Sequence, residues 1–244
     1  MPVSSIFRVL PFGLPGVLIP MKSASLSLVC ALALATSVSA ATVAGKVNFA
    51  TKRGQHPVPS ETLVRLEPVN VRIARPVPEA FQMVTRGKMV VPHVLAIPAG
   101  STVSFPNDDP ISHNLFSLSS GNSFDLGLYR RGAGKSQRFD TPGIVNVYCN
   151  VHPNMSAVIQ VVDTPYYAFA DGNGNYSIAD VPPGRYRLVA WNEQGGETES
   201  PIDVTSTGTV SGQLALMIDS RNFRVVQHLN KLGKPYEAPS LRDY

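Results

Sequence analysis

Four side chains of the sequence could bind one metal ion together. Cys149, His152 and Met155 follow one another at intervals of three residues, and His113 precedes them in a separate polar stretch. A thiolate, two imidazoles and a weak axial thioether form the ligand set of a trigonal copper site that carries single electrons. The residue types therefore predict such a site, with His113, Cys149, His152 and Met155 as its ligands.

Other interpretations of these residues are open. Cys149 could be a buried structural cysteine with His152 near it by chance. Zinc is the rival metal, although zinc sites favour Cys, His and carboxylate ligands and do not recruit a thioether. A Cys–His nucleophile pair is disfavoured, because a thiol aimed into the end of a sandwich is badly placed for a substrate. A multicopper oxidase would need more histidines than the remaining His56, His93 and His228.

The local pattern explains how a fold could bring the four side chains together. Alternation along a strand at 144–149 places Val145, Val147 and Cys149 on one face, so the thiol would point into the core. A tight turn over residues 150–154, stiffened by Pro153, would return His152 and Met155 to the same point. The loop at 106–124 precedes this strand and carries His113.

The rest of the chain is predicted to be nearly all β. Turn signals recur every 8–12 residues, which favours β-sandwiches. A short helix is expected at 221–232, where Phe223, Val226 and Leu229 share one face. The expected strands are 42–49, 61–67, 88–97, 101–105, 124–130, 136–139, 144–149, 156–162, two strands around the turn at 182–184, and 209–218.

Composition excludes several classes of protein. The 244 residues are 43% hydrophobic and 16% charged, with 19 Gly and 21 Pro, which is too little Gly and Pro for a collagen or a disordered tract. The formal charge of +4 comes without a run of like charges, so nucleic acid is not expected as a partner. No apolar stretch beyond the N-terminal region is long enough for a polytopic membrane protein.

The N-terminal region reads as an export signal. Lys22 supplies the positive charge after an expected start at Met21, residues 26–35 are apolar, and Val38-Ser39-Ala40 is a small-residue cleavage site. Removal of residues 1–40 would leave Cys149 as the single cysteine. An unpaired thiol in an oxidising compartment needs an explanation, and metal binding supplies one. The periplasm is the expected location, and the alternative is a single membrane anchor.

The ligand residues also carry a family resemblance. The string YCNVHPNM resembles the C-x2-H-x2-M copper loop of cupredoxins, with the spacing of amicyanin, and FPNDDPISHN resembles the stretch with that family's first histidine. The resemblance covers residues 79–163 and implies a Greek-key sandwich. It also implies that Asn114 bridges the two ligand loops, that His152 is the electron port and that Val151 and Pro153 belong to a docking patch. Tyr148 offers a second electron route. The whole mature chain further resembles exported plastocyanin-like proteins described as methylamine utilization proteins.

The flanks carry a second resemblance. Residues 42–49 and the string ADGNGNYSIADVPPGRYRLVAW resemble a carboxypeptidase-regulatory-like, transthyretin-like sandwich. We therefore expect a split sandwich of residues 41–78 and 164–219, with the cupredoxin unit 79–163 inserted in it, and a helix and tail at 220–244. The alternative is a sheet extension without its own core.

These observations predict an exported carrier of single electrons that binds one copper ion and is not an enzyme. Its partner would be another redox protein, and the chain would be a monomer that is not integral to a membrane after processing. The alternatives are a copper-delivery protein without redox traffic and an envelope scaffold with structural copper. A hydrogen-bonded role is favoured for His93, a solvated one for His56 and His228, and a hairpin turn rather than a calcium loop for the segment that starts at Asp171.

Overall fold

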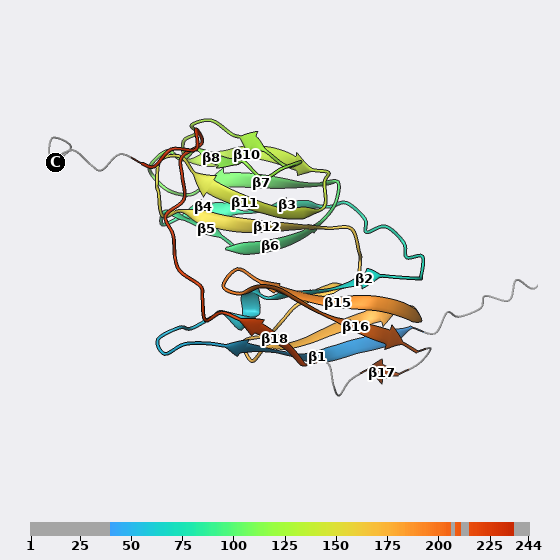
Figure 1. Cartoon of the computed structure of the whole chain (residues 1–244). Helices are drawn as coiled ribbons and strands as arrows, with labels where there is room; N and C mark the ends of the chain where they lie inside the picture. The colour runs from blue at the N-terminus through green and yellow to red at the C-terminus, as the bar shows by residue number, and fades with distance from the viewer. Residues whose placement is uncertain (1–39, 206–207, 211–214, 237–244) are drawn as a thin grey trace, which may run out of the picture. The chain divides into compact units, whose positions relative to one another are not determined.

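The computed structural model describes residues 40–205, 208–210 and 215–236, shown in Figure 1. All of them belong to one compact unit, Val38–Tyr244. The predicted export signal at 1–40 therefore lies almost wholly outside the described residues. Within them, no helix is long and apolar enough to span a membrane.

The middle of the chain forms two five-stranded sheets. One has the order β10-β7-β4-β5, with β3 also paired to β7, and the other has the order β6-β12-β11-β8-β9. In Figure 1 these strands are the green and yellow ones. Their bounds are β3 Ala80–Gln82, β4 Val84–Arg86, β5 Met89–Val91, β6 Val94–Pro98, β7 Ser101–Asn107, β8 Leu115–Ser117, β9 Phe124–Asp125, β10 Gly132–Phe139, β11 Gly143–Cys149 and β12 Ser156–Val162.

Strands from both sides of this segment form two four-stranded sheets. One has the order β14-β1-β17, with β18 also paired to β1, and the other has the order β13-β2-β15-β16. A single 3-10 turn, η1 (Pro59–Glu61), lies before β2 among the described residues. The strand bounds are β1 Ala41–Ala50, β2 Leu63–Pro68, β13 Tyr167–Phe169, β14 Asn175–Val181, β15 Gly184–Asn192, β16 Gly196–Val204, β17 Thr209–Val210 and β18 Ala215–Asp219.

Each pair of sheets encloses its own apolar core. Alternating burial along the strands supplies both cores, because every second side chain points inward. Val103 and Phe105 of β7 and Val145 and Val147 of β11 belong to the core of residues 81–161. Val43, Ile178 and Leu188 belong to the other. A smaller cluster joins Val94 and Val158 to Trp191, which is therefore a core residue.

The predicted all-β sandwich class is confirmed, and the helix prediction is wrong for the described residues 220–236. These residues form turns and extended chain. Val226 and Leu229, two of the three residues of the expected apolar face, are 79% and 48% exposed, so too little of that face is covered to stabilise a helix. His228 is also not simply solvated, since its ring stacks on Tyr148 with the centroids 4.4 Å apart.

One hydrogen bond joins the segment between β5 and β6 to the turn between β15 and β16, and we expect its contribution to stability to depend on pH. His93 Nε2 lies 2.5 Å from Glu193 Oε2, and this carboxylate raises the pKa of His93 above its ordinary value near 6.5. The stabilisation is therefore complete below the ordinary pKa and is lost as pH rises through the raised pKa of the folded protein. In thermal unfolding between about pH 5.5 and pH 8.5, the stability gap between wild type and His93→Gln should shrink as pH rises. A gap that is constant with pH would contradict this account.

Candidate metal centre

Cys149 ends β11 with its side chain in the core. The alternation expected from the sequence holds, since Val145, Val147 and Cys149 are all fully buried. Cys149 is a free cysteine. Its thiol therefore lies at the end of the sandwich interior, without contact with solvent.

The chain turns back on itself directly after Cys149. The Met155 N–H donates to His152 O at 3.0 Å, and the Cys149 N–H donates to Met155 O at 3.0 Å. These two bonds close the turn, and Pro153 within it has no N–H to satisfy. His152 is thereby held beside the strand end from which Cys149 projects.

His113 is held by the loop between β7 and β8. Asn107 at the end of β7 shapes this loop, because its Oδ1 accepts from the Asp109 N–H at 2.8 Å and its Nδ2 donates to Ile111 O at 2.8 Å. His113 then pairs with Tyr129 through two backbone hydrogen bonds. The His113 side chain is fully buried as a result.

The three side chains meet around one point. His113 Nδ1 lies 3.8 Å and His152 Nδ1 lies 3.6 Å from Cys149 Sγ, and one ligand atom of each residue lies within 4.8 Å of the others. A sulfur and a nitrogen bound to the same ion at ordinary bond lengths are at most about 4.4 Å apart. Both separations meet this limit, so the donor set fits a thiophilic metal such as copper or zinc.

Met155 lies close to this group along the chain and is 1% exposed. Its side chain belongs to the same apolar cluster as Cys149 and Leu115. Since an apolar core position suits any methionine, burial alone does not make it a ligand. Its role as the fourth ligand therefore stays a prediction.

A buried carboxylate holds the outer nitrogen of His113. His113 Nε2 lies 2.9 Å from Asp109 Oδ2, and the backbone N–H groups of Gly87 and Lys88 also donate to this carboxylate. Burial would raise the pKa of Asp109, but these hydrogen bonds lower it below its ordinary value. An ionised Asp109 accepts a hydrogen bond from the Nε2–H group and leaves Nδ1 free to face Cys149.

The electrostatics of His152 favour its neutral form. Burial, His113 and Lys88 together lower the pKa of His152 below its ordinary value. A neutral imidazole presents a lone pair at one nitrogen, which is what a metal ligand requires. The two ring centroids of His113 and His152 are 4.9 Å apart and tilted by 55°.

Asn114 connects the two ligand-bearing loops through its backbone. Its carbonyl accepts from the Asn150 N–H at 2.8 Å, while its side chain donates to Asp125 Oδ1 at 2.5 Å. The bridge between the loops thus uses the backbone of Asn114, and its side chain reaches β9. Tyr148 is half-buried against His228, away from the fully buried thiol.

Sequence reasoning missed Asp109, Asn107 and Asp125. Asp109 and Asn107 stand four and six residues before His113. A ligating histidine usually donates its outer N–H to a carboxylate or a carbonyl, so a nearby acid was a weak signal, but the sequence does not show which way its side chain points. Asp125 had no such signal, because its contacts come from residues distant in the sequence. His93 is bonded to Glu193 and is not part of the His113, Cys149 and His152 group.

The segment after β13 forms the expected turn. Asp171 Oδ1 accepts from the backbone N–H groups of Asn173 and Asn175, each at 2.8 Å. The carboxylate is thus engaged within its own hairpin, as in an ordinary Asx turn.

Comparison with known proteins gives partial matches. No curated protein matches the chain. A family model described as polysaccharide lyase family 4, domain II, matches residues 153–211, less than half of the chain. Since this match starts within the turn after Cys149 and ends just after β17, it does not assign the whole chain to that family.

Several solved structures resemble part of the chain. A purple cupredoxin from Nitrosopumilus maritimus is 27% identical over 33% of this chain and 98% of its own, with a TM-score of 0.30. A mutant of amicyanin in the reduced state is 19% identical over 34% of this chain and 82% of its own, with a TM-score of 0.32. A Cu-containing nitrite reductase from Thermus scotoductus SA-01 is 22% identical over 48% of this chain and 28% of its own, with a TM-score of 0.33.

Replacement of Asp109 tests its role in the buried network. Asp109→Ala leaves two backbone N–H groups and His113 Nε2 without their acceptor, so the free energy of unfolding should fall by about 3 kcal/mol. Asp108→Ala is the matched control, because Asp108 is exposed and pairs with Arg86 at the surface. Its loss should cost under about 1 kcal/mol. Urea unfolding of the metal-free proteins measures both, and equal effects would contradict the assignment.

Proposed function

We propose that this protein is an exported mononuclear copper protein that carries single electrons. One observation carries the proposal: a fully buried, unpaired thiol with the Nδ1 atoms of two histidines 3.6 and 3.8 Å away. Both histidines turn the same nitrogen toward the sulfur. Cys149, His113 and His152 would hold the metal, and Met155 would be the weak fourth ligand.

The surrounding fold suits a site that must keep its geometry. Cys149 is held by a strand, His152 by a closed turn, and His113 by Asp109 and a backbone pair with Tyr129. Bound copper would supply a one-electron Cu(I)/Cu(II) couple at this place. Ligands that cannot move far keep the structural change between the two oxidation states small.

Burial argues against a nucleophilic enzyme. A substrate must be able to reach the thiol of a nucleophilic cysteine, and reactive cysteines are therefore partly exposed. Cys149 has no exposed surface. We therefore favour a carrier without bond chemistry of its own, as the sequence indicated.

Electrons would enter and leave beside His152. Its ring is partly exposed, whereas His113 is sealed behind Asp109, and Val151 next to it is 44% exposed. A partner protein can dock on an apolar surface beside a half-buried ligand without removing a charged group from water. Copper held by Cys149, His113 and His152 would take up one electron from one partner protein and give it to another in a separate encounter.

Metal loading tests the proposal. Titration of the protein with Cu(II) should saturate at one ion per chain and give the intense visible absorption and narrow hyperfine splitting of a copper–thiolate bond. Cys149→Ser should lose the colour because no thiolate remains. His56→Gln is the control, since His56 is exposed and remote in sequence.

Different outcomes would support the other roles. Colourless protein that retains zinc in competition with copper would contradict electron transfer. Copper that binds with colour but exchanges rapidly with a chelator, without fast electron exchange, would indicate delivery rather than transport.

Met155 is tested by its effect on the reduction potential. Met155→Leu keeps the apolar volume and removes the thioether, so copper should still bind with its colour. The potential should rise, because a weak donor that stabilises Cu(II) has been removed. Voltammetry of both proteins measures the change, and an unchanged potential would show that Met155 is only a core residue.

A further inference from the structure

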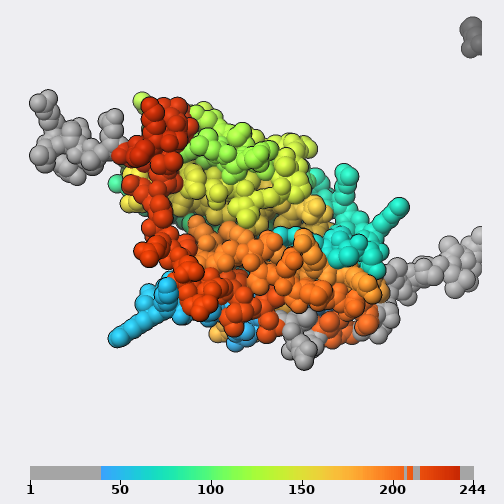
Figure 2. All heavy atoms as spheres, in the orientation of Figure 1, coloured from blue at the N-terminus to red at the C-terminus, as the bar shows by residue number. Residues whose placement is uncertain are grey.

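The chain after β18 crosses to the candidate metal centre. We refer to residues 221–236 as the C-terminal strap, which is red in Figure 1 and forms a strip on the surface in Figure 2. No strap residue belongs to the apolar core clusters of the described residues. Val225 and Leu232 are 90% and 75% exposed. The strap is attached through its hydrogen bonds, its ion pair and its ring contacts.

These contacts converge on the strand end that carries Cys149. The Tyr236 hydroxyl donates to Cys149 O at 2.8 Å, and the Lys231 N–H donates to Asn150 Oδ1 at 3.0 Å. One residue earlier, the Tyr148 ring stacks on His228 with an interplanar angle of 17°. Three successive residues, Tyr148, Cys149 and Asn150, thus each contact the strap.

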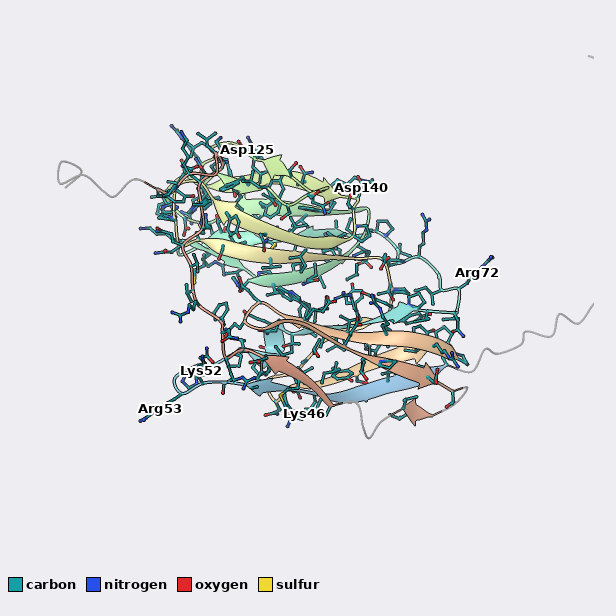
Figure 3. All side chains as sticks on the ribbon, in the orientation of Figure 1. Lys46, Lys52, Arg53, Arg72, Asp125 and Asp140 are labelled. Atoms are coloured by element: carbon teal, nitrogen blue, oxygen red, sulfur yellow. The ribbon has the colours of Figure 1, made fainter. Side chains whose placement is uncertain are left out.

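The same strap also reaches the loop that carries His113. Lys231 Nζ donates to Asp125 Oδ2 at 2.7 Å, and Asp125 Oδ1 accepts from the side chain of Asn114 at 2.5 Å. The Asn114 carbonyl accepts from the Asn150 N–H. A closed ring of hydrogen bonds therefore runs through Lys231, Asn150, Asn114 and Asp125. Figure 3 labels Asp125 at this end of the sandwich and Asp140 at the other.

The carboxylate of the ring, Asp125, stays ionised over the ordinary pH range. Burial acts against ionisation of Asp125, but hydrogen bonds from Lys231, Asn114 and Gly127 lower its pKa to about 2. The Asp125 carboxylate is therefore ionised at neutral pH, where it accepts the hydrogen bonds from Lys231 Nζ and Asn114 Nδ2.

We propose that the C-terminal strap is a positioning segment of the metal centre, in which Lys231 and Tyr236 hold the Cys149 and His113 loops at a fixed separation. The positioning role that we infer for the strap rests on the proposed copper function, whereas the contacts of the strap do not. Asn150 and Asn114 directly follow two of the expected ligands, so a ring that fixes them limits how far the thiol and the imidazole can separate. No strap side chain needs to touch the metal for this effect.

Hydrogen exchange of the metal-free protein tests the mechanical part. In Lys231→Met/Tyr236→Phe, the Asn150 amide should exchange at least about 5-fold faster, because about 1 kcal/mol of local stabilisation is lost. Lys234→Met is the matched control, since it removes a nearby strap lysine outside the ring. Lys231→Arg should restore most of the protection through its own pair with Asp125. Tyr236→Phe alone serves as the test if the double variant does not fold.

Copper release and the copper spectrum test the positioning part. The double variant should release copper to a chelator about 10-fold faster, as expected when groups that orient ligands are lost, and its hyperfine splitting should change. A strap that only stabilises the fold would lower the unfolding temperature and leave release and spectrum unchanged.

The two proposals can fail separately. If wild-type protein bound no copper, the proposed function would be wrong, while the exchange rates would still show whether the strap fixes the loops. If Asn150 exchanged at the control rate in the double variant, or if copper release matched the control, the strap would not be a positioning segment.

Discussion

The structure depends on a thiol that is buried without a covalent partner. At the end of an apolar core, Cys149 Sγ faces Nδ1 of the buried His113 and Nδ1 of the partly exposed His152, and among the described residues it is the group that each of these nitrogens contacts. Polar atoms buried in such an environment are costly unless something satisfies them. A metal ion shared by the three side chains would satisfy all of them at once. The proposed function gives a physical reason for an arrangement that an ordinary core would avoid.

The rest of the fold can be understood from this constraint. A sandwich interior supplies the burial, since β7 and β11 direct every second residue into one core. Two loops meet at the end of the sandwich. Asn107 shapes the loop that carries His113, and the backbone hydrogen bonds of Met155 close the turn that carries His152. Asp109 then orients one ring from behind. Each of these features restricts the movement of a side chain that could otherwise move away from the other two.

The sequence was informative where the information is local. The spacing of Cys149, His152 and Met155, and the alternation of valines before them, are properties of one short segment, so the strand and its turn could be predicted. The partner of the outer nitrogen of His113 was harder to predict, because the sequence does not show that the Asp109 carboxylate points inward. The strap could not be predicted at all, since its contacts join residues about 80 to 110 positions apart. The helix prediction for this segment was wrong because it also depended on distant residues. Three apolar residues on one face do not stabilise a helix unless another part of the chain covers them.

The second pair of sheets contacts the first through the cluster of Val94, Val158 and Trp191 and through the His93–Glu193 hydrogen bond. The central claim nevertheless concerns three atoms of the first pair: one sulfur and two Nδ1 nitrogens around one ion. A crystal structure of copper-loaded protein, with anomalous scattering recorded at the copper edge, measures this directly. The account predicts a single strong peak bonded to Cys149 Sγ and to the Nδ1 atoms of His113 and His152. A peak elsewhere, ligation through Nε2, or a chain without copper whose thiol points away from both rings would contradict it.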